Sequence, residues 1–387
     1  MGSPGLIPPF MPSFRSLAFR GVRLSDRLAS FLPACGGFRP LRGSFSAFNR
    51  LRDGILGGSI LHPCQAIGSK PPGSITEKSR LTQDDCQPWP VFWTVEENAR
   101  LTGGIRLWRD AADRYCAEGN FHFDGRRRLG EDRFLAHMLP GPQRRLEGAW
   151  TSIASNWGDG RNYFHWITDG LTRLLVRGSL PETTRILLPV GGASYIRETL
   201  ELLGLSEVSE CPRDNHLIVD RFYFCSPVAM TGVWNPLGFD WLRESFRKYF
   251  RPPASGPPVF LTRRASTRIP GDLPGIERIF ANAGFEIVDC GTLGVRQQIE
   301  LASGAKAVAG VHGAAMTNLL WSPPGTPVLE LFLPGYLNAC YEQIAFQGSL
   351  HYTPLILMPG DSPKLINEWV QHLEPGKDAT GRFDPEA

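Results

Sequence analysis

His165 and Asp169 lie four residues apart in the stretch NYFHWITDGLTRLLV, which has a helical pattern of apolar residues. On a helix this spacing places two side chains on the same face, where they can touch. A carboxylate beside an imidazole fixes its tautomer and raises its basicity, as a general base requires. Spacing alone more often gives a surface ion pair, but the aromatic neighbours of His165 would partly remove this pair from water. We therefore interpret His165 and Asp169 as a candidate base.

A second group of candidate residues follows two predicted buried strands in the C-terminal half. Arg263 follows the first of these strands, and His312 follows the second, within the string KAVAGVHGAAMTNLLW. Both side chains are expected at carboxyl ends of strands, where open α/β sheets bind their ligands. Gly313 and Ala314 open a short helix, whose first backbone N–H groups and dipole favour an anion. Two cationic or donor groups around a helix start are what a diphosphate requires.

Two further polar residues belong to the same stretch. Glu330 lies within an apolar strand and must have a partner if it is buried. Hydroxyls of a ribose or sugar are plausible partners for this carboxylate, and so is a structural arginine. Asn318 lies within the short helix and is equally suited to reach a ligand or to cap a loop.

Several common binding motifs are missing from the sequence. It contains neither G-x-G-x-x-G nor G-x-x-x-x-G-K-[ST], which weakens dinucleotide and P-loop interpretations. It has no D-x-D string, so no metal is required to hold a diphosphate. The eight cysteines form no C-x-x-C pair and are interpreted as ordinary thiols. We expect neither a metal nor a cofactor.

The composition is that of a globular protein without a strong charge bias. A formal net charge of +3 is too small to indicate a nucleic-acid partner. No apolar run approaches the roughly 20 residues that a membrane helix needs.

Strands and helices alternate through most of the chain, which predicts parallel α/β units. The segment 90–146 lacks helical periodicity and is expected to be rich in strands. Apolar runs predict strands at 185–190, 217–225, 259–262, 285–289, 307–311, 327–332 and 352–357, and helical spacing predicts helices at 162–176, 194–203, 238–249, 273–283, 295–303, 314–321, 338–347 and from Ser362.

Composition also divides the chain into segments. The N-terminal region is rich in Arg, Ser, Gly and Pro and poor in acidic residues, as transit peptides are. We interpret it instead as a disordered leader or linker and expect the folded protein to begin near Pro88. The expected organisation is a leader over 1–87, an N-terminal α/β domain over 88–250, a proline-rich linker over 251–258, a C-terminal Rossmann-like domain over 259–375 and a tail over 376–387.

The run GVHGAAMTNLLWSPPGTPVLELF, preceded by Thr262-Arg263-Arg264 and by NYFHWITDGL, resembles glycosyltransferase family 61. The resemblance covers roughly residues 90–357. That family includes bacterial capsule-type enzymes, plant xylan arabinosyl- and xylosyltransferases and animal O-linked N-acetylglucosaminyltransferases. It implies a GT-B architecture of two facing Rossmann-like domains, with a closing C-terminal helix here. It also implies inverting, metal-independent transfer from a nucleotide sugar, usually a UDP-sugar.

The resemblance assigns roles to individual residues. It implies that the base faces the acceptor from the first domain, and that Asn318 and Glu330 line the nucleotide or sugar pocket. It implies that the diphosphate is held by Arg263, His312, Gly313 and Ala314. Where family members often have an Asn after the second Arg, this chain has Arg268-Ile269-Pro270-Gly271-Asp272, which affects the contacts expected from that loop.

Two alternatives remain at this point. His165, Asp169 and Gly170 match the H-x-x-x-D-G string of coenzyme A-dependent acyltransferases, although this reading gives the stretch around His312 no task. A non-catalytic sugar-binding relative is the other alternative, since a fold does not imply activity. By analogy with the family, the expected acceptor is a bacterial polysaccharide or glycolipid handled in the cytoplasm or at the inner face of the membrane.

Overall fold

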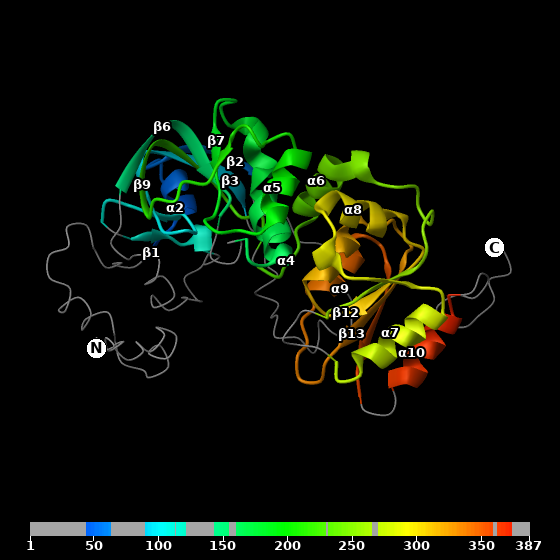
Figure 1. The fold of residues 1–387 in the computed structure, drawn as a ribbon. Helices are drawn as coiled ribbons and strands as arrows, with labels where there is room; N and C mark the ends of the chain where they lie inside the picture. The colour runs from blue at the N-terminus through cyan, green and yellow to red at the C-terminus, as the bar shows by residue number, and fades with distance from the viewer. Residues whose placement is uncertain are drawn as a thin grey trace, which may run out of the picture.

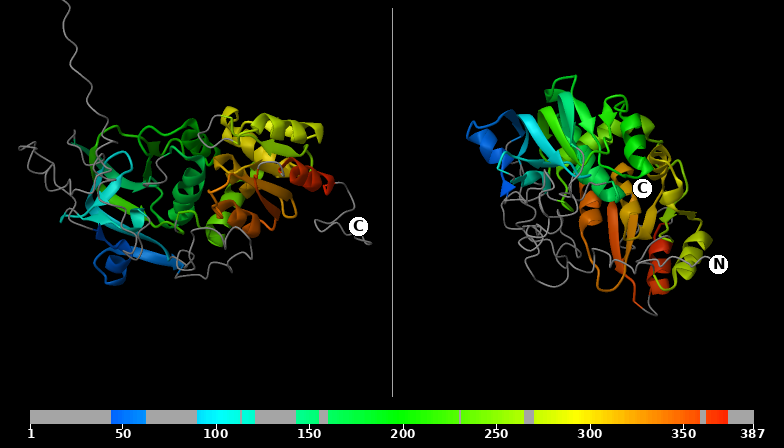
Figure 2. Two further views of the ribbon diagram at one scale, coloured as in Figure 1. Left: turned by 90° about the horizontal axis from the view of Figure 1, so that it is seen from below. Right: turned by 60° about the vertical axis from the view of Figure 1, so that its left-hand side comes forward.

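A computed structural model describes residues 44–62, 90–112, 114–120, 143–154, 160–229, 231–264, 270–358 and 362–373. Within them the chain forms two sheets with helices between and around them, so the α/β prediction is confirmed (Figure 1). Figure 2 shows from two other directions that the sheets lie on opposite sides of a central group of helices. No helix in these ranges is long and apolar enough to cross a membrane.

The first sheet is mixed rather than fully parallel. Its described strands run in the order β1-β5-β4-β3-β9-β6-β7-β8, with β2 paired to β3. Strands β9, β6, β7 and β8 are parallel to one another, whereas β3 is antiparallel to β9, β4 and β2. The strands are β1 (Ser44–Phe45), β2 (Gly57–His62), β3 (Val91–Thr102), β4 (Leu107–Arg109), β5 (Tyr115–Cys116), β6 (Gln143–Ser152), β7 (Arg185–Leu187), β8 (Ser209–Glu210) and β9 (His216–Cys225).

The start of the folded region differs from the prediction of Pro88. Residues 44–62 form β1, α2 (Ala47–Arg52) and β2, which belong to the first sheet and its core. Ala47 is fully buried, and the carboxylate of the fully buried Glu118 accepts from Ser46 Oγ at 2.5 Å and from two backbone N–H groups of α2. Composition could not reveal this, because the partner Glu118 lies some seventy residues away. The rest of the predicted leader and the tail after residue 373 lie outside the described residues.

The helix that carries His165 and Asp169 connects β6 to β7. It begins as α4 (Tyr163–His165), continues as a π-helical turn η5 (Trp166–Gly170) and ends as the 3₁₀ helix η6 (Leu171–Ser179). Asn162 caps its start, with the side chain accepting from Phe164 N at 3.0 Å. The predicted apolar stripe is also confirmed, because Phe164, Ile167, Leu171 and Leu174 are all buried. Single π-turns of this kind are frequent at functional sites.

The second sheet is fully parallel. Its five strands are β10 (Val259–Leu261), β11 (Glu286–Val288), β12 (Val308–Val311), β13 (Pro327–Phe332) and β14 (His351–Ile356). They run in the order β11-β10-β12-β13-β14, so the direction of winding reverses between β10 and β12. In doubly wound sheets ligands bind at such a reversal, beyond the carboxyl ends of the strands.

Helices cover both faces of this sheet. The outer face carries α7 (Leu273–Asn282) and the terminal helix α10 (Ser362–Gln371), which lie side by side (Figure 1). The inner face carries α8 (Val295–Gly304), the 3₁₀ helix η9 (Ala314–Trp321) and α9 (Cys340–Gln347), with η8 (Cys290–Thr292) before α8. The inner helices meet α5 (Ser194–Leu202) and α6 (Pro236–Phe246) of the first half.

The two halves share one hydrophobic core. A single cluster of buried residues contains Trp166 and Phe246 from the first half and Ile299 and Trp321 from the second. Backbone groups are also bonded across the boundary. Arg243 donates to Leu320 O and to Ser322 O. An apolar interface of this kind opposes the relative motion that separate domains ordinarily show.

The hydrogen bonds between Glu118 and the start of α2 can be tested by replacing Glu118 with glutamine. The amide keeps one acceptor oxygen but turns an NH₂ group toward backbone donors, so bonds to a buried charged group are lost. We expect Glu118→Gln to lower the free energy of unfolding by about 1–3 kcal/mol in urea. Glu182→Gln, at an exposed position, is the matched control and should leave stability unchanged. Equal stability of both variants would contradict a structural role for residues 44–62.

Candidate active site

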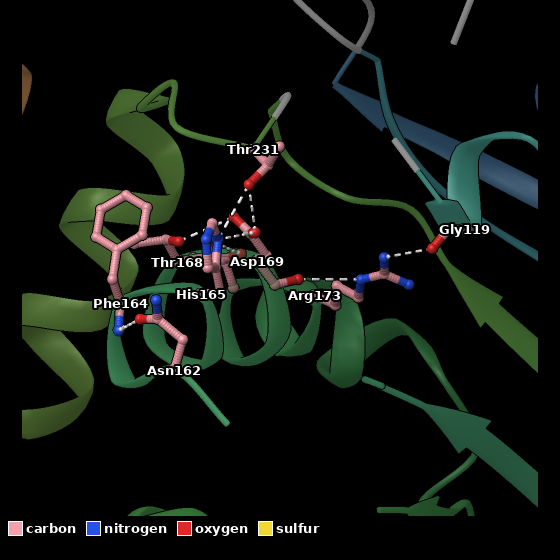
Figure 3. Close-up of polar contacts among 9 residues, drawn as sticks. Gly119, Asn162, Phe164, His165, Thr168, Asp169, Arg173 and Thr231 are labelled. Carbon is pink, nitrogen blue, oxygen red and sulfur yellow. Dashed lines mark hydrogen bonds and ion pairs between the residues drawn. The ribbon is translucent and has the colours of Figure 1, made fainter. Parts of the chain in front are cut away.

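His165 and Asp169 are in contact, as their spacing predicted. His165 Nδ1 lies 2.8 Å from Asp169 Oδ2, and Asp169 is buried while the imidazole is partly exposed (Figure 3). A carboxylate oxygen accepts a hydrogen bond, so Nδ1 of His165 carries the proton and donates a hydrogen bond to Asp169. In this tautomer Nε2 is the acceptor nitrogen of the ring, so it is the atom suited to take a proton.

Two threonines complete the hydrogen bonds of Asp169. Thr168 Oγ1 donates to Oδ1 at 2.8 Å, and Thr231 Oγ1 donates to Oδ2 at 2.7 Å. Thr231 Oγ1 also lies 3.1 Å from His165 Nδ1. Figure 3 shows the threonine above both side chains of the pair. Sequence analysis missed Thr231, because it is 62 residues from Asp169 and lies in a loop without a recognisable motif.

A buried arginine supports the same helix from behind. The guanidinium of Arg173 is 1% exposed, and its Nε donates to the backbone oxygen of Asp169 at 3.1 Å. Its Nη2 donates to the backbone oxygen of Gly119 (Figure 3). Gly119 directly follows Glu118, the residue whose carboxylate binds the start of α2. Burial lowers the pKa of Arg173 to about 10, so the group stays charged at neutral pH. The N-terminal segment, the first sheet and the base are thus joined by one chain of contacts.

Arg263 and His312 meet at the winding reversal of the second sheet. Arg263 lies two residues beyond β10 and His312 directly follows β12, the two strands between which the direction changes. Arg263 Nη1 donates to the backbone oxygen of His312. A Cβ atom added at Gly313 would lie 2.7 Å from Arg263 Nη1, so any other residue here would displace the guanidinium from this position. The same residues precede η9, whose first N–H groups have no partner within the helix.

His312 forms a second histidine–carboxylate pair. Its Nδ1 lies 2.5 Å from Glu330 Oε1, and Tyr352 donates to Glu330 Oε2 at 2.5 Å. Glu330 is fully buried, whereas His312 is 7% exposed and stacks on Phe332. Because the carboxylate fixes Nδ1 as the donor, Nε2 of His312 is the nitrogen left for a further contact.

The roles implied for Glu330 and Asn318 need correction. Both oxygens of the fully buried Glu330 are bonded, one to His312 and the other to Tyr352, so this carboxylate acts on the histidine and does not line a pocket. Asn318 is 2% exposed, donates to Gln298 Oε1 at 2.9 Å and accepts from Tyr163. It therefore joins the two halves. Spacing could not show either outcome, since each depends on partners from distant elements.

The start of α9 lies between the two histidine–carboxylate pairs. The ring of Tyr341 lies 5.1 Å from that of His312 and 5.5 Å from that of Phe164, which in turn contacts His165. Burial raises the pKa of the neighbouring Cys340 thiol, and the carboxylates of both pairs raise it further. The candidate residues of the two halves thus converge on one place.

The loop in which this chain departs from the family pattern is only partly described, because Arg268 and Ile269 lie outside the described residues. Among the residues that are described, no three His, Cys, Asp or Glu side chains are grouped so that they could hold a metal ion.

Comparison with protein-family models gives a match to the model described as Glycosyltransferase 61, over residues 163–329. This match supports the resemblance to glycosyltransferase family 61. The family 61 segment includes all the candidate residues except Glu330, which directly follows it. It spans both halves and therefore includes the elements that face each other across the shared core. A comparison with curated proteins gives no match.

The buried carboxylate of Glu330 should make the stability of the protein depend on pH. Burial raises the pKa of Glu330 above its ordinary value of 4.5, against the lowering effect of the bonds from His312 and Tyr352. A group with a raised pKa in the folded state favours folding fully below its unfolded pKa, and this contribution is lost as pH rises. We therefore expect wild-type stability to fall relative to Glu330→Gln as pH rises from 4.5 toward neutrality.

Urea unfolding of both proteins across that pH range measures this difference. Glu368→Gln, an exposed glutamate on α10, is the control and should show no pH-dependent difference from wild type. A raised pKa of Glu330 in the folded state would be contradicted if the difference in the free energy of unfolding between wild type and Glu330→Gln stayed constant with pH. A change of this difference in the opposite direction with pH would contradict it as well.

Proposed function

We propose that the protein is an inverting, metal-independent glycosyltransferase that moves a sugar from a UDP-sugar to a hydroxyl of a saccharide or glycoconjugate. The match to family 61 supports the glycosyltransferase activity itself. The observation that carries the finer proposal is the pairing of Arg263 with His312 at the winding reversal, next to a histidine–carboxylate pair from the other half.

In this proposal the second half binds the donor in a GT-B-like arrangement. The parallel sheet with its reversal between β10 and β12 supports this assignment. The first half departs from a simple Rossmann unit, because five of its nine described strands lie outside the parallel set β6 to β9. We assign the first half to the acceptor.

His165 would act as the base. Its Nε2 would take the proton of the acceptor hydroxyl while that oxygen attacks the anomeric carbon. The bond between the anomeric carbon and the diphosphate oxygen would break as the new bond forms, with inversion. Asp169 would stabilise the imidazolium that results, since it already accepts from Nδ1.

The negative charge of the leaving diphosphate develops at the other side of the site. Arg263, the Nε2 of His312 and the first N–H groups of η9 are donors suited to that charge, and fixed donors of this kind are effective where water is excluded. Without a metal, these protein groups would carry the whole task.

The family match favours this function over a coenzyme A-dependent acyltransferase. The H-x-x-x-D-G string alone fits both, but the acyltransferase reading leaves the His312–Glu330 pair without a role.

UDP binding by the full chain, followed by calorimetry, tests the donor site. Each lost hydrogen bond to the diphosphate removes about 1.5–3 kcal/mol, so Arg263→Ala and His312→Ala should each weaken binding about 10- to 100-fold. His351→Ala, an exposed histidine on β14, should bind as wild type does. Unchanged UDP affinity in both site variants would refute the donor-site assignment.

Release of UDP from UDP-N-acetylglucosamine and UDP-xylose, with a mixed saccharide acceptor pool, tests the base. His165→Ala should lower turnover about 10²- to 10⁴-fold, the usual contribution of a general base, while UDP affinity is retained. Wild-type turnover in this variant would show that His165 is not the base.

A further inference from the structure

Gln343 on α9 reaches from the second half to a loop of the first. Its Oε1 accepts from Trp234 N at 3.1 Å, and its Nε2 donates to Gly232 O at 3.3 Å. The side chain is 6% exposed, so both bonds are shielded from water. The amide thus uses an acceptor and a donor on the same loop, a geometry that fixes the loop's position rather than only covering it.

The loop that Gln343 holds is the one that carries Thr231. Thr231 directly precedes Gly232 and gives Asp169 Oδ2 its second donor at 2.7 Å. Asn235 closes the base of the loop, with its side-chain nitrogen donating to Val228 O at 2.9 Å. Between these points Gly232 has a φ of +81°, a conformation that glycine adopts without strain.

We propose that Gln343 is a positioning residue for the base, acting through Thr231. The inference rests on the proposed function, because it takes His165 as the base. Gln343 fixes the loop, the loop places the Thr231 hydroxyl on Asp169, and Asp169 holds Nδ1 of His165. The base of the first half is therefore completed by a side chain of the second half.

The same helix also contacts the donor side. Tyr341, two residues before Gln343, packs against the ring of His312. One element of eight residues thus contacts both histidine–carboxylate systems, the first through the loop and the second directly.

A double-mutant cycle separates this role from a general effect on folding. Thr231→Val removes the hydroxyl at nearly constant volume, and Gln343→Ala removes the loop's anchor. Because misplacement of a catalytic group is costly, each should lower kcat about tenfold or more with UDP affinity unchanged. Residues that act through each other are not additive, so the double variant should be no slower than the slower single variant.

Gln347→Ala, the same substitution one turn along α9 at a partly exposed position, should retain wild-type kcat. Gln343→Glu keeps the acceptor for Trp234 N but loses the donor to Gly232 O. It should lower kcat in the same direction by a smaller factor, and it provides the test if the alanine variant does not fold.

A second measurement needs no sugar donor. In a ¹⁵N-histidine spectrum of the full chain, the ring signals of His165 are assigned by their loss in His165→Asn. Thr231→Val and Gln343→Ala should shift the Nδ1 signal of His165 in the same way, and Gln347→Ala should leave it in place.

The proposal would be overturned if the loss of kcat in the double variant equalled the product of the two single losses. It would also be overturned if the His165 signal were unshifted in Gln343→Ala. These outcomes differ from failure of the proposed function. Wild-type turnover in His165→Ala would refute the base itself, whereas an inactive His165→Ala with a fully active Gln343→Ala would refute only the role of Gln343.

Discussion

The burial of one carboxylate determines how the first half is built around its site. Asp169 is 5% exposed, and a buried carboxylate is stable only where its oxygens are hydrogen-bonded. Its side chain accepts from Thr168, Thr231 and His165, which come from the same helix and from a distant loop. The π-turn, the buried Arg173 behind it and the loop held from α9 all serve to bring these donors to one place.

The two histidine–carboxylate pairs differ in a way that suits different tasks. Glu330 is fully buried and closed off by Tyr352, so His312 is held within a rigid and nearly dry surrounding. His165 is more exposed and is bonded to a carboxylate that also accepts from a loop hydroxyl. A rigid donor suits a charge that develops in a fixed position, whereas an exposed imidazole suits an acceptor that must enter and leave.

Much of the second half could be predicted from sequence, because its information is local. The bounds of η9 and β13 coincide with the prediction, and the strand-end positions of Arg263 and His312 follow from strand assignments alone. The contact of His165 with Asp169 likewise follows from helical spacing. What could not be predicted depends on distant partners. The Glu330 carboxylate accepts from Tyr352, which lies on another strand. Residues 44–62 belong to the first sheet and its core, and Glu118 binds the helix within them.

The central claim is that the two halves form one site, with the diphosphate at the winding reversal of the second sheet and the base supplied by the first. The most direct test is an experimental structure of the full chain with UDP bound. The account predicts the diphosphate against Arg263, His312 and the start of η9, on the side that faces His165. UDP bound on the first sheet, or on the outer face under α7 and α10, would contradict it.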